Sequence, residues 1–96
     1  MSDDDQTLIP GSFVALYADG RRRLTLPRAE LRARYELCED MAQLLVEQCK
    51  GIHYSQGVAE DVIVERVHAG LANPASGFSE AEARWIVTRL AELLGW

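Results

Sequence analysis

Residues 78–96, the last nineteen of the chain, carry the clearest structural signal in the sequence. Ser79 followed by Glu82 is typical of a capping box, in which each residue binds the backbone N–H of the other at a helix start. Gly95 suits the left-handed conformation that closes a helix, and Trp96 can fold back over the last turn. Between these two signals, apolar residues recur on one face at helical spacing: Ala83, Ile86, Val87, Leu90, Leu93 and Leu94. The segment predicts one complete amphipathic helix.

A longer helix is predicted in the middle of the chain. Pro27 fits a first helical turn, and apolar residues recur at near-heptad spacing over residues 31–52, a length of about six turns. The helix is expected to end between residues 50 and 56, with Gly57 as the terminator. Gly51 either ends the helix or lies inside it, at a cost of about 1 kcal/mol relative to alanine.

A third helix is expected over residues 59–72, because Glu60 and Asp61 favour the positive end of a helix and an apolar stripe follows them. Residues 73–77 are expected to form a loop. Three helices in a chain of this length are enough for one small core. The sequence therefore predicts an all-α fold, a small bundle of three main helices.

The segment that precedes these helices allows two structures. Ser12 can cap a short helix that runs through Tyr17, or residues 12–17 and 21–26 can pair as a hairpin around an Asp19-Gly20 turn. An isolated hairpin is marginally stable, so a short helix or an extended arm is favoured. Residues 1–7 are predicted to be a disordered tail, and residues 8–96 a single helical domain.

The formal charge is −5, but it is unevenly distributed. Six of the nine arginines lie within fourteen residues: Arg21, Arg22, Arg23, Arg28, Arg32 and Arg34. Such a basic face can bind phosphates, although the overall acidity argues against a dedicated nucleic-acid binder. The alternatives are a solvated arm, an acidic protein partner, or pairing with an acidic stripe of Glu36, Asp40 and Glu47.

The expected location is the cytoplasm. The sequence has no apolar run of the ~18–20 residues that cross a bilayer, and its N-terminus has three aspartates where a signal peptide has basic residues. Cys38 and Cys49 would lie about 16 Å apart on one helix. A disulfide needs Cα atoms within about 7 Å, so both thiols are expected to be free.

Catalytic and metal-binding patterns are incomplete. Cys49 and His53, at i and i+4, provide half of a zinc site, and the pattern from Glu65 to His68 occurs once where di-iron bundles use it twice. A buried thiol and helix-surface histidines are the favoured alternatives. We expect no catalytic residue, metal or cofactor. Trp85 and Trp96 either anchor a partner at an exposed surface or fill the core of the bundle.

Three segments resemble a family of short, largely uncharacterised proteobacterial proteins, some of which carry the label ATPase with chaperone activity. They are residues 34–41 (Arg-Tyr-Glu-Leu-Cys-Glu-Asp-Met), 57–62 (Gly-Val-Ala-Glu-Asp-Val) and 80–96, which ends in Leu-Ala-Glu-Leu-Leu-Gly-Trp. The resemblance covers most of residues 8–96 and implies no established site residues. The chain has no Gly-x-x-x-x-Gly-Lys phosphate loop, so the label implies at most an accessory role beside a larger ATPase.

These observations predict a non-enzymatic cytoplasmic interaction module, an adaptor or regulator that binds a partner protein or itself. Its predicted interaction residues are Arg21, Arg22, Arg23, Arg28, Arg32, Trp85 and Trp96. The alternative is a nucleic-acid-associated regulator that uses the basic face over residues 21–34.

Overall fold

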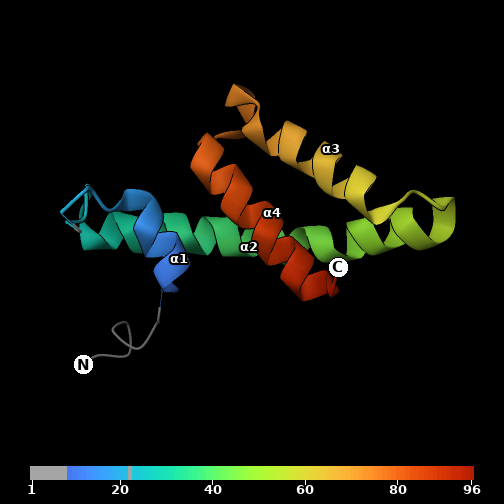
Figure 1. Ribbon diagram of the computed structural model, residues 1–96, viewed down its shortest axis with the longest axis horizontal. Helices are drawn as coiled ribbons and strands as arrows, with labels where there is room; N and C mark the ends of the chain where they lie inside the picture. Colours follow the sequence, from blue (N-terminus) through green and yellow to red (C-terminus); the bar gives the residue numbers. More distant parts are fainter. Residues whose placement is uncertain (1–8, 22) are drawn as a thin grey trace. The chain divides into compact units, whose positions relative to one another are not determined.

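The computed structural model describes residues 9–21 and 23–96, which form an all-α structure (Figure 1). By compactness the chain divides into two units, residues 1–36 and residues 37–96, and each is described by itself. The predicted disordered tail over residues 1–7 and the predicted interaction residue Arg22 lie outside the described residues. The prediction of one domain over residues 8–96 stays a prediction.

The first unit begins with a short helical segment. Helix α1 (Gly11–Val14) continues into the 3-10 turn η2 (Ala15–Tyr17). Pro10, rather than the expected Ser12, occupies the N-cap position, and its carbonyl accepts the N–H groups of Phe13 and Val14 at 3.0 and 3.1 Å. Proline has a fixed φ that suits this entry into a helix. The prediction that Ser12 caps the helix is therefore wrong.

A tight loop follows, closed by one antiparallel bridge between Ala18 and Leu24. The Asp19 N–H donates to the Arg23 carbonyl at 2.8 Å, and the Thr25 N–H donates to the Tyr17 carbonyl at 2.7 Å. The favoured short helix is thus present over residues 11–17. Hairpin pairing is confined to this bridge, and the described residues contain no extended strand.

An aromatic cluster holds the first unit together. Phe13 is fully buried, and its ring centroid lies 5.6 Å from that of Tyr17 and 5.5 Å from that of Tyr35 in a T-shaped contact. Leu31, in the first turns of the next helix, is also buried. Aromatic pairs at these distances add to the stability gained from burial.

The main helices are α2 (Arg28–Gln56), α3 (Glu60–Ala72) and α4 (Glu80–Leu94), and the 3-10 turn η3 (Pro74–Ser76) joins the last two. These bounds confirm the three predicted helices. α2 passes from the first unit into the second, runs through Gly51 and ends before Gly57, which has a φ of +69°. None of the helices described combines the length and the apolar composition that crossing a bilayer requires.

The predicted ends of α4 are both confirmed. The Ser79 hydroxyl accepts the Glu82 N–H at 3.0 Å, and the Glu82 carboxylate accepts the Ser79 N–H at 2.9 Å. At the other end Gly95 has a φ of +75°, which turns the chain so that the Trp96 N–H donates to the Ala91 carbonyl at 3.0 Å.

The core of the second unit takes one buried residue from each main helix: Cys49 from α2, Ile63 from α3 and Leu90 from α4. Partly buried hydrophobic residues surround these three: Leu45, Val46, Ile52, Val58, Val67, Leu94 and Trp96. The core therefore holds α3 and α4 against the C-terminal half of α2.

Candidate interaction groove between α3 and α4

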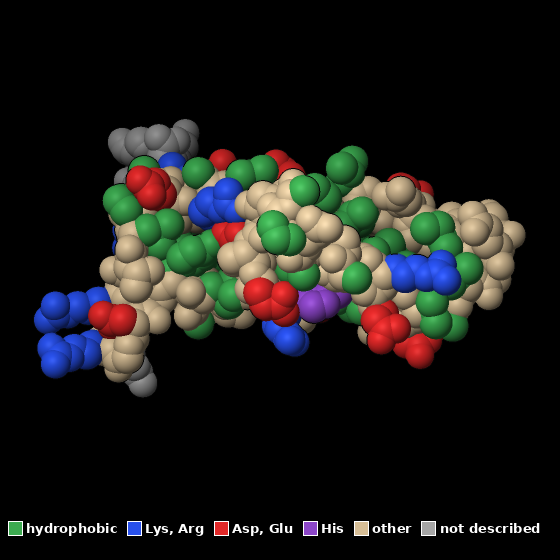
Figure 2. All heavy atoms as spheres, turned by 90° about the horizontal axis from the view of Figure 1, so that it is seen from above, with side chains coloured by type: hydrophobic (Ala, Val, Ile, Leu, Met, Phe, Trp, Pro, Cys, Tyr) green, Lys and Arg blue, Asp and Glu red, His purple; other side chains and the backbone are tan. Residues whose placement is uncertain are grey.

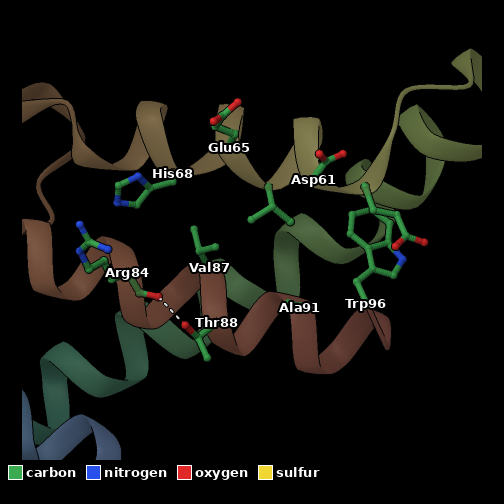
Figure 3. A pocket seen from close by; sticks show the side chains of 10 residues that line it. Asp61, Glu65, His68, Arg84, Val87, Thr88, Ala91 and Trp96 are labelled. Carbon is green, nitrogen blue, oxygen red and sulfur yellow. Dashed lines mark hydrogen bonds between the residues drawn. The ribbon is translucent and has the colours of Figure 1, made fainter.

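A groove of about 670 Å³ lies between α3 and α4 (Figure 3). Its lining is mostly apolar in the middle and charged at the edges. The lining residues are Glu60, Asp61, Val64, Glu65, His68, Arg84, Val87, Thr88, Ala91 and Trp96. We call this feature the α3/α4 groove.

Helical spacing places the apolar floor. Val64 lies one turn before His68 on α3, and Val87 lies one turn before Ala91 on α4, so each pair shares a face of its helix. Figure 3 shows Val87 pointing from α4 toward α3, and His68 pointing from α3 toward α4. These side chains fill only part of the space between the two helices, and the remaining volume is the groove.

Trp96 lines the groove near the C-terminal end of α4 (Figure 3). The left-handed Gly95 sets its position, and its ring packs against the core of the second unit. The Trp96 and His53 ring centroids lie 5.3 Å apart. His53 is itself held in place, because its Nδ1 donates to the Val58 carbonyl at 2.8 Å.

The α3 edge of the groove is acidic. Asp61 and Glu65 are exposed, and neither forms an ion pair within residues 9–21 and 23–96. They lie at i and i+4, and Figure 3 shows both along α3. Glu60 lies 3.7 Å from the His53 Nε2, within ion-pair distance when that imidazole is protonated. The edge therefore presents two carboxylates that the described chain leaves without a cation.

The other end of the groove is occupied by its own ion pairs. Glu80 lies 3.1 Å from the Arg84 Nε and 3.2 Å from the His68 Nε2. The His68 Nε2 is buried and has no hydrogen-bond partner in the described chain, so this contact has the distance of an ion pair without the alignment of a hydrogen bond. The Glu65-to-His68 pattern thus ends in an imidazole directed at α4.

The basic residues predicted for interaction lie in the first unit. Arg21, Arg23 and Arg28 are exposed and Arg32 is half-buried, and none of the four forms an ion pair within the described residues. Figure 2 shows basic side chains projecting into solvent at the left, where Figure 1 has the loop after η2 and the start of α2. Within the first unit, the alternative pairing of these arginines with Glu36 is not formed.

The two tryptophans differ in exposure. Trp85 is 8% exposed, so the prediction of an exposed anchor is wrong for this residue and its alternative, a core position, is confirmed. It lies next to Ile86 along the helix, and both are buried, which makes the buried face of α4 wider than the predicted stripe. Trp96 is half-buried and lines the groove.

The half zinc site from Cys49 and His53 is not assembled. Cys49 is buried in the core, where burial raises the pKa of its thiol. His53 uses its Nδ1 for the Val58 carbonyl. Among the described residues, no group of three or more histidine, cysteine or acidic side chains is placed to hold a metal ion.

Two further features of the second unit lie outside the predictions from the sequence. Arg89 on α4 forms a two-pronged ion pair with Glu39 on α2, across a separation of fifty residues that no local pattern reveals. Leu37 and Leu44 on α2 are 49% and 71% exposed and lie seven residues apart on one face. Their i, i+7 spacing was available in the sequence and indicates an apolar surface beside the buried stripe.

Comparisons with protein-family models, with curated proteins and with solved structures find no significant match to this chain.

Proposed function

We propose that this chain is a non-enzymatic protein-interaction module, an adaptor or regulator, and that the α3/α4 groove is its docking surface. One observation carries the proposal: along one edge of an apolar groove of about 670 Å³ lie exposed carboxylates that form no ion pair within the described residues. A partner that fits this surface places apolar side chains over Val64 and Val87 and a basic side chain beside Asp61 or Glu65. Burying the apolar part stabilises the complex, and the charges determine which partner fits.

The exposed leucines of α2 support the same function. Isolated surface leucines are ordinary, but Leu37 and Leu44 share a face with the half-buried Met41 between them. A second apolar surface is useful to a protein that joins partners. A smaller groove of about 300 Å³, lined by residues of α2 and α3, has no carboxylate in its lining and so lacks the charged edge of the α3/α4 groove.

A cytoplasmic location is part of the proposal. The two cysteines are free and buried, as expected for a chain in a reducing compartment. The non-enzymatic part is supported by the side chains that line the groove. Arg84 is held in an ion pair with Glu80, and no lining nucleophile is hydrogen-bonded to a base.

The test is affinity capture from the cells that make the protein, followed by mass spectrometry, with and without nuclease. The bait is compared with the variant Asp61→Lys/Glu65→Lys, which reverses two exposed charges of the groove edge without touching the core. The matched control is Asp40→Lys/Glu47→Lys, which makes the same change of net charge on exposed positions of α2.

A protein captured in stoichiometric amount by the wild type and the control, but not by the groove variant, supports the proposal. A partner retained equally by all three baits contradicts the assignment of the groove. Nucleic acid in the eluate, or partners lost with nuclease, favours the alternative regulator that uses the exposed arginines Arg21, Arg23 and Arg28.

A further inference from the structure

The loop between η2 and α2 exposes arginine side chains on a hydrogen-bonded turn. The Asp19 carboxylate oxygen Oδ1 accepts the Arg21 N–H at 2.8 Å and the Arg23 N–H at 3.0 Å, and the Ala18–Leu24 bridge closes the loop. Arg21 and Arg23 are exposed, and Leu24 is 38% exposed. We call residues 18–24, without Arg22, the basic loop. These hydrogen bonds hold the backbone N–H groups of Arg21 and Arg23, which lowers the ordering entropy that binding through these two residues costs.

Basic and acidic side chains are concentrated in different parts of the sequence. Residues 18–34 contain six arginines and two carboxylates. Residues 37–96 contain nine carboxylates and only four basic side chains. One copy therefore offers a basic surface to the acidic surface of another, and such complementary charges steer two molecules together.

We propose that the occupant of the α3/α4 groove is the basic loop of a second copy of this chain. The proposal rests on the function proposed above and names the partner. Arg21 and Arg23 of one copy meet Asp61 and Glu65 of the other, and each of these four side chains lacks an ion pair within the described residues. Both sides of the contact are thus available before the copies meet.

The loop also offers an apolar side chain. Leu24 is 38% exposed, so in this contact it can cover the apolar floor at Val64 and Val87. An arginine can stack on the Trp96 ring, a contact that strengthens as water is excluded.

The test is the mass of the intact chain in solution, measured by sedimentation over a wide range of concentration at low and at high salt. The wild type is expected to self-associate at low salt and to dissociate as salt screens the contact. Reversal of the loop charges in Arg21→Glu/Arg23→Glu, or of the groove charges in Asp61→Lys/Glu65→Lys, is expected to weaken association about tenfold or more.

Two further samples make the contact specific. A quadruple variant that carries both reversals restores opposite charges and is expected to recover most of the association. An equimolar mixture of the two double variants pairs an intact loop with an intact groove, and is expected to associate where each alone does not. Circular dichroism and thermal unfolding confirm that each variant is folded.

Matched controls reverse exposed charges elsewhere. Asp40→Lys/Glu47→Lys and Lys50→Glu/Arg66→Glu make the same changes of net charge and are expected to leave association unchanged. A wild type that stays monomeric overturns the proposal. The proposal is also overturned if the loop reversal or the groove reversal leaves association unchanged. It is overturned as well if the control variants abolish association equally, or if the quadruple variant does not recover it.

The two proposals fail separately. If the wild type is monomeric in solution, and the groove variant fails to capture a foreign protein that the wild type captures, the docking function stands. Only the occupant proposed here is then wrong. If the wild type is monomeric and the groove variant captures the same proteins as the wild type, both proposals are overturned.

Discussion

Arg89 on α4 binds both carboxylate oxygens of Glu39 on α2: its Nε lies 2.9 Å from Oε1, and its Nη2 lies 3.2 Å from Oε2. Gln43, one turn further along α2, donates to Oε2 at 2.8 Å. The Arg89 hydrogen bonds lower the pKa of Glu39, burial opposes this by raising it, and the Gln43 hydrogen bond lowers it further. The Glu39 side chain is 18% exposed and that of Arg89 is 34% exposed, so water screens the pair only in part.

Glu39→Gln is expected to lower the free energy of unfolding by about 1–2 kcal/mol at neutral pH, because Arg89 loses a charged partner. A carboxyl whose pKa is lowered by folding stabilises the protein above its unfolded pKa, and this contribution is lost as the pH falls through the lowered folded value. The difference between wild type and variant should therefore shrink in acid. Urea unfolding at neutral and acid pH measures it, with Glu36→Gln, an exposed position on the same helix, as the control. A difference that grows in acid would contradict this account.

Trp85→Ala is expected to destabilise the protein by about 3–5 kcal/mol, because it empties a buried site rather than a binding surface. Leu44→Ala, at a residue that is 71% exposed, should stay within about 0.5 kcal/mol of the wild type. Thermal and urea unfolding of the two variants test the contrast. Equal stability of Trp85→Ala and the wild type would place the indole outside the core.

Two glycines at the end of α2 should respond in opposite ways to alanine. Gly51 lies inside the helix with open space where a Cβ would be, so Gly51→Ala should stabilise the protein by about 0.5–1 kcal/mol. Gly57 has equal space but a φ of +69°, so Gly57→Ala should destabilise it by about 1 kcal/mol. Each variant is the control for the other in unfolding experiments. The same sign for both would show that backbone conformation does not decide the outcome.

Removal of the α4 cap should cost about 1 kcal/mol in Ser79→Ala, because the Glu82 N–H loses its acceptor. The Glu82 side chain is buried, so any disturbance of the box also affects a desolvated carboxylate. Ser55→Ala, at an exposed position near the end of α2, is the control and should change little. Equal unfolding midpoints for the two variants would argue that the cap contributes nothing.

Local signals were enough to predict the helices. The capping box at Ser79, the terminator Gly57 and the acidic start of α3 each act through their own backbone, so sequence spacing reveals them. The start of α1 was predicted wrongly, because a Pro10 carbonyl replaced the expected side-chain cap. The chain from α1 to Leu24 has features of both predicted alternatives, a short helix and a hairpin. A loop of this length can close with one bridge and needs no strand.

The α3/α4 groove could not be predicted from the sequence, for a different reason. Its floor and edge depend on how α3 and α4 face each other, and Val64 and Val87 are 23 positions apart in the chain. The sequence marks Trp96 by its residue type and by its place after Gly95, and Asp61 only as a favourable residue at a helix start. The pair of Arg89 with Glu39 required the same knowledge of packing.

The position of Trp96 has a practical consequence for experiments on this protein. Because Gly95 turns the chain back at the end of α4, any peptide fused after Trp96 begins beside the α3/α4 groove. A purification tag attached there would compete for the surface under study, and a polyhistidine tag would bring imidazoles to its carboxylate edge. Tags fused at the N-terminus and then removed, compared with a C-terminal fusion, would show directly how much of any measured binding passes through that groove.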